Sequence, residues 1–204
     1  MAEVSHRLAN FDNALREARE SVFRMASIAE QNLESAIRGL LTRNAELCNA
    51  AIVEDDEVNT LEKKIDADTF EILLRYNTVA SDLREENARV SDEAQSIARR
   101  ARKILKHPEI KEVALVEPLY EKAFTMLRDG MRSYAEGDTD LAIALYDRDK
   151  ALDKAQSEVI RELTKHMDNN TGRIKSFLHL IFIVRSLERV GDHAVNIAED
   201  GIFL

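Results

Sequence analysis

Two pairs of acidic residues are the most distinctive chemical feature of the sequence. Glu188 and Asp192 stand four residues apart in the stretch "SLERVGDHAVNIAED", and Asp149 and Asp153 have the same spacing in "YDRDKALDK". Residues at this spacing are neighbours on one side of a helix. Carboxylate oxygens are the preferred ligands of hard cations such as Fe(III), Mn(II), Mg(II) and Ca(II), and Zn(II) also accepts them. The pattern therefore indicates a metal site if the two helices face each other.

Other arrangements of these carboxylates stay open at this point. Four carboxylates on a half-buried surface repel one another, and removal from water adds to the cost. Protonation, ion pairs with Arg148, Arg185 or Arg189, or simple exposure to solvent would also relieve the repulsion. Gly191 costs about 1 kcal/mol relative to alanine within a helix. Its presence indicates the close approach of another backbone or of an ion with its waters.

The elements that carry these residues are predicted to be helices throughout. The chain has 204 residues, of which only six are Gly and two are Pro, and it contains no Trp. Such a composition is typical of long helices joined by short turns, and apolar residues recur near the helical period. The predicted class is all-α, with helices at about 9–43, 45–76, 79–106, 108 or 118 to 136, 140–167 and 174–198.

The two halves of the chain resemble each other. The stretch "AIVEDDEVNTLEKKID" aligns with "ALYDRDKALDKAQSEV", which places Asp55 against Asp149 and Asn59 against Asp153. We predict an internal duplication that gives two pseudo-symmetric three-helix bundles, stacked or arranged end to end. Helices of this length make an elongated molecule. The proline of "KHPE" separates the two predicted domains, which are residues 1–107 and 108–204.

Composition argues against several classes of protein. The net charge of −9 disfavours nucleic-acid binding. The single cysteine, Cys48, cannot form an internal disulfide and is predicted to be a small buried residue. The sequence shows no signal peptide, and its longest apolar run, "FLHLIFIV", is far shorter than the roughly 20 residues of a membrane span. We therefore expect a cytoplasmic protein.

The sequence also lacks the usual groups of an enzyme. It contains no Gly-rich phosphate loop and no Gly-x-Ser-x-Gly elbow. The Glu-x-x-His spacing of di-iron bundles occurs only at Glu3 and His6. His193 adjoins Asp192 but points about 100° away around the helix, so we predict a surface histidine. A carboxylate-bridged metal hydrolase or oxidase is therefore disfavoured.

"SLERVGDHAVNIAED" closely resembles the characteristic phrase of the PhoU family of phosphate-uptake regulators. "YDRDKALDK" is similar to the family's Asp-x-x-x-Asp motif, and "VASDLR" at 79–84 is similar to the start of a helix in its first repeat. The resemblance extends over nearly the whole chain and includes the duplication. It implies two pseudo-symmetric three-helix bundles without enzymatic activity, in a cytoplasmic protein that is often a homodimer.

The resemblance also implies a role and partners. Members of the family are negative regulators of phosphate uptake and phosphate-starvation signalling. The expected partners are the ATPase of the phosphate ABC transporter and the phosphate-sensing histidine kinase, with membrane association only through these partners. An alternative is an accessory domain or partner of another phosphate carrier, such as a sodium-coupled or low-affinity system.

Some members of the family bind iron, zinc, manganese or magnesium through their acidic motifs. Carried over residue by residue, the resemblance implies Asp149, Asp153, Glu188 and Asp192 as metal ligands, with Asn196 as a weaker candidate. The corresponding ligand in the first repeat would be Asp55.

The first repeat departs from the family pattern. Asn59 stands where a second carboxylate is expected. In one register the two ligand positions of the next helix fall on Ile97 and Ala101, and in a shorter register they fall on Ala88 and Asp92. The glutamate is missing in both, so we predict a weakened or absent metal site in this repeat.

Overall fold

The computed structural model describes residues 2–73, 79–169 and 171–202, and these residues are helical apart from short connections. The predicted all-α class is confirmed. The elements are α1 (Ala2–Leu41), α2 (Ala45–Leu73), α3 (Val79–Leu105), the 3₁₀ turn η1 (Lys111–Val116), α4 (Glu117–Glu136), α5 (Thr139–Asn169), the 3₁₀ turn η2 (Thr171–Arg173) and α6 (Ile174–Ile202). The predicted end of the second helix near residue 76 lies outside the described residues.

Short-range capping explains where several helices begin and end. The side chain of Asn44 accepts hydrogen bonds from the backbone N–H groups of Glu46 and Leu47, which caps the start of α2. Pro118 lies in the first turn of α4, where its missing N–H costs nothing. Gly137 ends α4 in the left-handed conformation, at φ +66°. Asp138 then caps the start of α5 by accepting from the N–H of Leu141.

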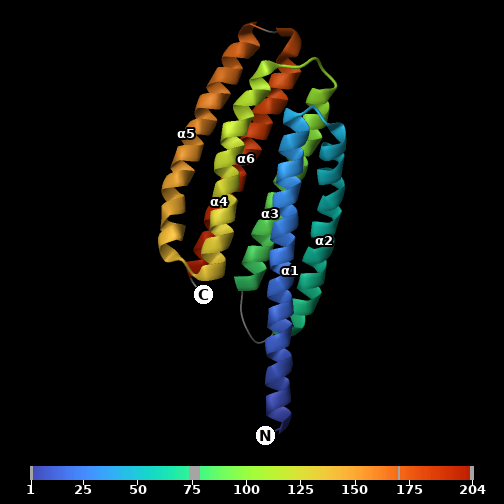
Figure 1. The fold of residues 1–204 in the computed structure, drawn as a ribbon, viewed down its shortest axis with the longest axis vertical. Coiled ribbons are helices and arrows are strands. Elements are labelled where there is room, and N and C mark those ends of the chain that lie inside the picture. Colours follow the sequence, from blue (N-terminus) through green and yellow to red (C-terminus); the bar gives the residue numbers. More distant parts are fainter. Residues whose placement is uncertain (1, 74–78, 170, 203–204) are drawn as a thin grey trace.

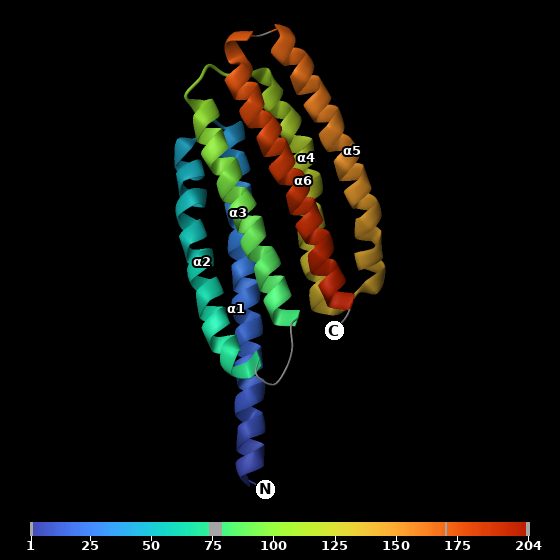
Figure 2. The ribbon, with the colours of Figure 1, turned by 180° about the vertical axis from the view of Figure 1, so that it is seen from behind.

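The two repeats form two three-helix bundles that lie side by side. Helices α1, α2 and α3 form the first bundle, and α4, α5 and α6 form the second (Figure 1). The bundles join through α3 and α6, which run antiparallel next to each other (Figure 2). The end-to-end arrangement that the sequence left open is therefore wrong. Seen from the side of Figure 2, α2, α3, α6 and α5 make one layer, with α1 and α4 behind it.

The core is apolar and closely packed. Its largest fully buried side chains include Leu33 and Ile37 of α1 and Phe177 of α6. Helices α4 and α6 approach so closely that a Cβ atom on Gly130 would lie 2.5 Å from the carbonyl oxygen of Ala194. This contact fixes the position of α6, which carries Glu188 and Asp192. In the part of the chain that the structure describes, no helix combines the length and the apolar character that crossing a membrane requires.

Candidate metal site and its surroundings

The structure brings the two acidic pairs together. Asp149 and Asp153 project from α5, and Glu188 and Asp192 project from the neighbouring α6. Burial raises the pKa of Glu188, and the charges of Asp192 and Asp153 raise it further against the opposing effect of Arg189. We name Asp149, Asp153, Glu188 and Asp192 the acidic cluster. Its members are close enough to repel one another when all are ionised.

The pKa values of Asp149 and Asp192 are raised as well. Burial raises the pKa of Asp149, and the charges of Asp192 and Asp153 add to the rise. The pKa of Asp192 is raised first by burial and then by the charge of Asp153, although His193 and Arg189 oppose the rise. A positive charge bound among these carboxylates would therefore stabilise the folded chain.

One oxygen of the acidic cluster has no hydrogen-bond partner. Asp149 Oδ1 is buried and receives no donor among the described residues. It lies beside Gly191, where an added Cβ would be 3.7 Å from this oxygen and only 2.3 Å from the Leu152 side chain. Gly191 therefore lets α5 and α6 approach each other at the level of the acidic cluster. A buried carboxylate oxygen without a donor is costly to the folded chain.

None of the three arginines considered from the sequence forms an ion pair with the acidic cluster, although the charge of Arg189 partly offsets its repulsion. Arg148 pairs with Asp129 of α4, and Arg189 pairs with Glu93 of α3 at 3.0 Å. Arg185 forms no ion pair with any residue that the structure describes. The ion-pair alternative therefore does not account for the cluster.

The four carboxylates of the acidic cluster fit a hard metal ion by chemical type. Their side chains do not converge on one point. Among the described residues, no three His, Cys, Asp or Glu side chains are grouped so that they could hold a metal ion. Asp153 and Asp192 are exposed and can change rotamer without repacking the core. The metal ligands derived from the sequence stay a prediction.

The acidic residue of the first repeat is held by neutral donors. Asp55 is only 3% exposed. Its oxygens accept hydrogen bonds from Ser91 Oγ at 2.7 Å, from Gln95 Nε2 at 2.5 Å and from Asn59 Nδ2 at 3.2 Å. A carboxylate with three neutral donors is already satisfied. These contacts support the predicted weakening of the first site, although Asp55 itself stays a predicted ligand.

Ser91 and Gln95 are the residues that the sequence analysis missed. They approach Asp55 from α3 as Glu188 and Asp192 approach Asp149 from α6. Neither of the two registers considered from the sequence selected them. In this third register neither carboxylate is kept, so the sequence offers no signal that would have selected it.

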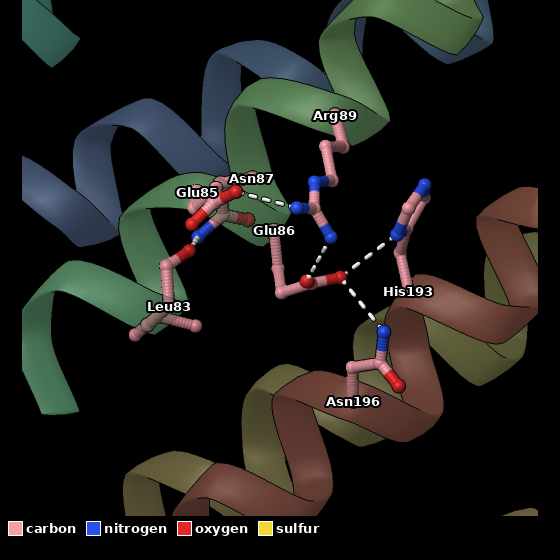
Figure 3. Close-up of polar contacts among 7 residues, drawn as sticks. All are labelled: Leu83, Glu85, Glu86, Asn87, Arg89, His193 and Asn196. Atoms are coloured by element: carbon pink, nitrogen blue, oxygen red, sulfur yellow. Dashed lines mark hydrogen bonds and ion pairs between the residues drawn. The ribbon is translucent and has the colours of Figure 1, made fainter.

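Asn196 does not point into the acidic cluster. Its amide donates to Glu86 Oε2 of α3 at 3.1 Å, and His193 Nδ1 lies 2.8 Å from the same oxygen (Figure 3). Arg89 binds the other oxygen of Glu86 at 2.9 Å. We name Glu86, His193 and Asn196 the inter-repeat clamp. The structure thus gives Asn196 a role in joining the repeats, and His193 is half-buried rather than the surface histidine that was predicted.

The inter-repeat clamp favours the ionised form of its carboxylate. Burial alone would raise the pKa of Glu86, but the hydrogen bonds from His193 and Asn196 and the charges of His193 and Arg89 hold the pKa below its usual value. A lowered carboxylate pKa means that the clamp stabilises the fold above the unfolded-state value of 4.5. This stability is lost as the pH falls through the lower, folded-state pKa.

Replacing Glu86 with alanine is expected to lower the free energy of unfolding by about 2 kcal/mol at neutral pH, because two half-buried polar partners lose their acceptor. Urea denaturation measures the change. Glu85→Ala is the matched control, since Glu85 is exposed on the same helix and should cost less than about 0.5 kcal/mol. Equal losses for the two variants would show that the clamp does not hold the repeats together.

The described surface also carries a groove that is separate from the acidic cluster. It lies between α4 and α5, has a volume of about 530 Å³, and includes Lys122, Asp129 and Arg148 in its lining. None of the four clustered carboxylates lines it. The acidic cluster is therefore not part of this groove.

Fold and site together define a helical-bundle protein built from two copies of one unit, with an acidic cluster in the second copy. Comparison with known proteins also finds two copies of one unit. The PhoU domain family matches residues 22–107 and again residues 116–201. The chain therefore belongs to the PhoU family, whose members are accessory regulators, and it is not an enzyme.

Individual relatives cover almost the whole chain. It is 32% identical to a Pseudomonas putida protein described as a phosphate-specific transport system accessory protein PhoU homolog, over 98% of this chain and 83% of that protein. The crystal structure of PhoU from Pseudomonas aeruginosa superposes with a TM-score of 0.89 at 28% identity, covering 95% of this chain and 97% of that one. The phosphate transport system regulatory protein PhoU from Streptococcus pneumoniae, with a TM-score of 0.82 and 17% identity over 95% of both chains, shares the fold.

Proposed function

We propose that the chain is a negative regulator of phosphate uptake and of phosphate-starvation signalling. It acts in the cytoplasm by contact with the ATPase of the phosphate ABC transporter and with the phosphate-sensing histidine kinase. The observation that carries this proposal is the similarity along nearly the whole chain to relatives named as phosphate-specific transport system accessory proteins. A homodimer is the form we expect to act.

The second repeat is the proposed site of a bound metal ion. Asp149, Asp153, Glu188 and Asp192 would hold iron, zinc, manganese or magnesium, and the ion would supply the positive charge that these carboxylates lack. The buried, unpartnered Asp149 Oδ1 and the raised pKa values of three of the four carboxyl groups support this site. Asn196 is left to the inter-repeat clamp. Asp55 is proposed to bind an ion less strongly than the acidic cluster does, because neutral donors already satisfy its carboxylate.

Binding to the transporter tests the proposed function. The chain, immobilised on a biosensor, is expected to bind the ATPase subunit of the phosphate transporter from its own organism at least tenfold more tightly than the ATPase of an unrelated importer, a difference of about 1.4 kcal/mol. The cytoplasmic part of the phosphate-sensing kinase is tested in the same way. In cells, deletion of the gene should switch on a phosphate-starvation reporter at high phosphate. A normal reporter in the deletion strain, together with equal affinity for the two ATPases, contradicts the proposal.

A further inference from the structure

An exposed apolar stripe runs along the first half of α6. Ile174, Leu178 and Phe182 follow one another at intervals of four residues and are 37%, 42% and 42% exposed. Scattered exposed apolar residues are ordinary, but three large ones on one stripe form a continuous surface that is costly to leave in water. The first half of α6, which carries this stripe, lies beside the second half of α3 (Figure 2).

The neighbouring half of α3 is strongly basic. Arg99 and Lys103 are exposed one turn apart, and Arg100, which follows Arg99, contacts Phe182 of α6. No carboxylate among the described residues forms an ion pair with any of these three cations. Arg100 covers the ring of Phe182, with Cζ 4.1 Å from the ring centroid. The basic row and the apolar stripe therefore form one surface, which we name the basic–apolar face.

The electrostatics of this region differ from those of the rest of the chain. The pKa of the nearby His179 is lowered first by burial and then by the charges of Lys103, Arg100 and His107. The chain as a whole has a net charge of −9. A local positive field on an acidic protein is a signal for complementary association, since such fields set the specificity and the rate of encounter.

We propose that the basic–apolar face docks an acidic amphipathic helix of a partner protein. Carboxylates on the partner would meet Arg99 and Lys103, and its apolar side chains would cover Leu178 and Phe182, as in other helix-in-groove contacts. A partner segment is favoured over an anionic membrane, because a membrane would meet the whole net charge of −9. A short helix of a partner protein would interact mainly with the positive charges of the basic–apolar face. The inference rests on the proposed function, which requires a protein partner, and names the surface and the charge of that partner.

A designed peptide tests the face directly. The probe is a fluorescein-labelled, helix-stapled peptide with glutamates along one side and leucines at i and i+4 on the other. By fluorescence anisotropy, it is expected to bind the full chain about tenfold more tightly than the same peptide with lysine in place of glutamate. Raising the salt concentration should weaken the binding, because exposed charges are screened.

Variants locate the contact. Arg99→Glu/Lys103→Glu and Phe182→Ser are each expected to weaken peptide binding about tenfold. The matched controls are Lys63→Glu, an exposed cation on α2, and Ile143→Ser, an apolar residue of α5 that is 57% exposed. Both controls should bind as the wild type does. Circular dichroism melts establish that every variant is folded.

Several results would overturn the inference. One is equal binding of the acidic and the basic peptide, and another is unchanged binding by Arg99→Glu/Lys103→Glu. A third is binding to phosphatidylglycerol vesicles that Phe182→Ser abolishes, which would assign the face to a membrane. A fourth is a wild-type dimer that dissociates on Phe182→Ser in sedimentation, which would assign it to a second copy. Peptide binding, combined with equal affinity for the two ATPases and a normal reporter in the deletion strain, would contradict the proposed function and leave the face supported.

Discussion

Replacing Glu188 with glutamine and Asp192 with asparagine is expected to raise the melting temperature in metal-free buffer at neutral pH. Their pKa values in the folded chain lie above the ordinary ones, so the folded state binds protons more readily than the unfolded state. The resulting cost to stability is complete at neutral pH and disappears as the pH falls through the folded-state pKa values. Because the side chains are partly exposed, we expect a gain of about 1 kcal/mol.

The same double variant is expected to lose the stabilisation that a metal ion gives to the wild type. An ion present at a hundred times its dissociation constant stabilises a folded protein by about 2.7 kcal/mol. Melting curves in EDTA and then in manganese, iron, zinc or magnesium measure the effect, and elemental analysis gives the number of ions per chain. We expect one ion or one small cluster, lost in the variant.

A matched control comes from the first repeat. Ser91→Ala/Gln95→Ala alters the residues that hold Asp55 and should leave the metal-dependent rise unchanged. If the wild type takes up no metal, or if the Glu188→Gln/Asp192→Asn variant keeps the full rise, the acidic cluster is not a metal site. The chain would then regulate by protein contact alone.

Replacing Gly130 with alanine is expected to destabilise the second repeat strongly. The new Cβ would lie 2.5 Å from the carbonyl oxygen and 3.3 Å from the carbonyl carbon of Ala194, which are backbone atoms of α6. A backbone cannot rotate away as a side chain can, so α4 and α6 must separate. Overpacking costs about 3 kcal/mol, and alanine returns about 1 kcal/mol through its higher helix propensity.

The net loss for Gly130→Ala is therefore about 2 kcal/mol, or about 4–8 °C in melting temperature for a chain of this size. Differential scanning calorimetry measures it. Gly172→Ala is the control, since an added Cβ there meets no atom within 4 Å, and it should leave the melting temperature nearly unchanged. A variant at Gly130 as stable as the wild type would show that the two helices are held less closely than the structure has them.

The helices were predictable because their ends carry local signals. Asn44, Pro118 and Gly137 each act within a few residues of their own position, and the structure starts or ends a helix at each of them. The facing acidic pairs were predictable for a related reason. Two residues four apart on each of two consecutive helices must meet if the helices are antiparallel neighbours.

The junction between the repeats could not be predicted in the same way. The side of α3 that packs against α6 carries Glu86, Glu93 and Arg100, which a hydrophobic pattern assigns to solvent. The partner of Glu86 is His193, which lies 107 residues further along the chain. No local spacing connects them. The resemblance made Asn196 a weaker candidate ligand, and nothing local in the sequence shows that its amide donates to Glu86 on the other repeat.

The residues that hold Asp55 were missed in the sequence because they are neutral. Ser91 and Gln95 satisfy Asp55 without any charge of their own, so a search for paired carboxylates passes over them. Only the contact with a buried carboxylate shows their importance.

The polar side of α3 has a consequence for how the chain is made. On the ribosome, α3 is complete once residue 105 has emerged, whereas α6 begins only at residue 174. Domains fold as units during synthesis, and an apolar surface exposed in the interval would invite aggregation. The side of α3 that later packs against α6 carries Glu86, Glu93 and Arg100, so it remains hydrated until α6 has been synthesised. The first repeat can therefore fold early and stay soluble until α6 arrives to complete the junction.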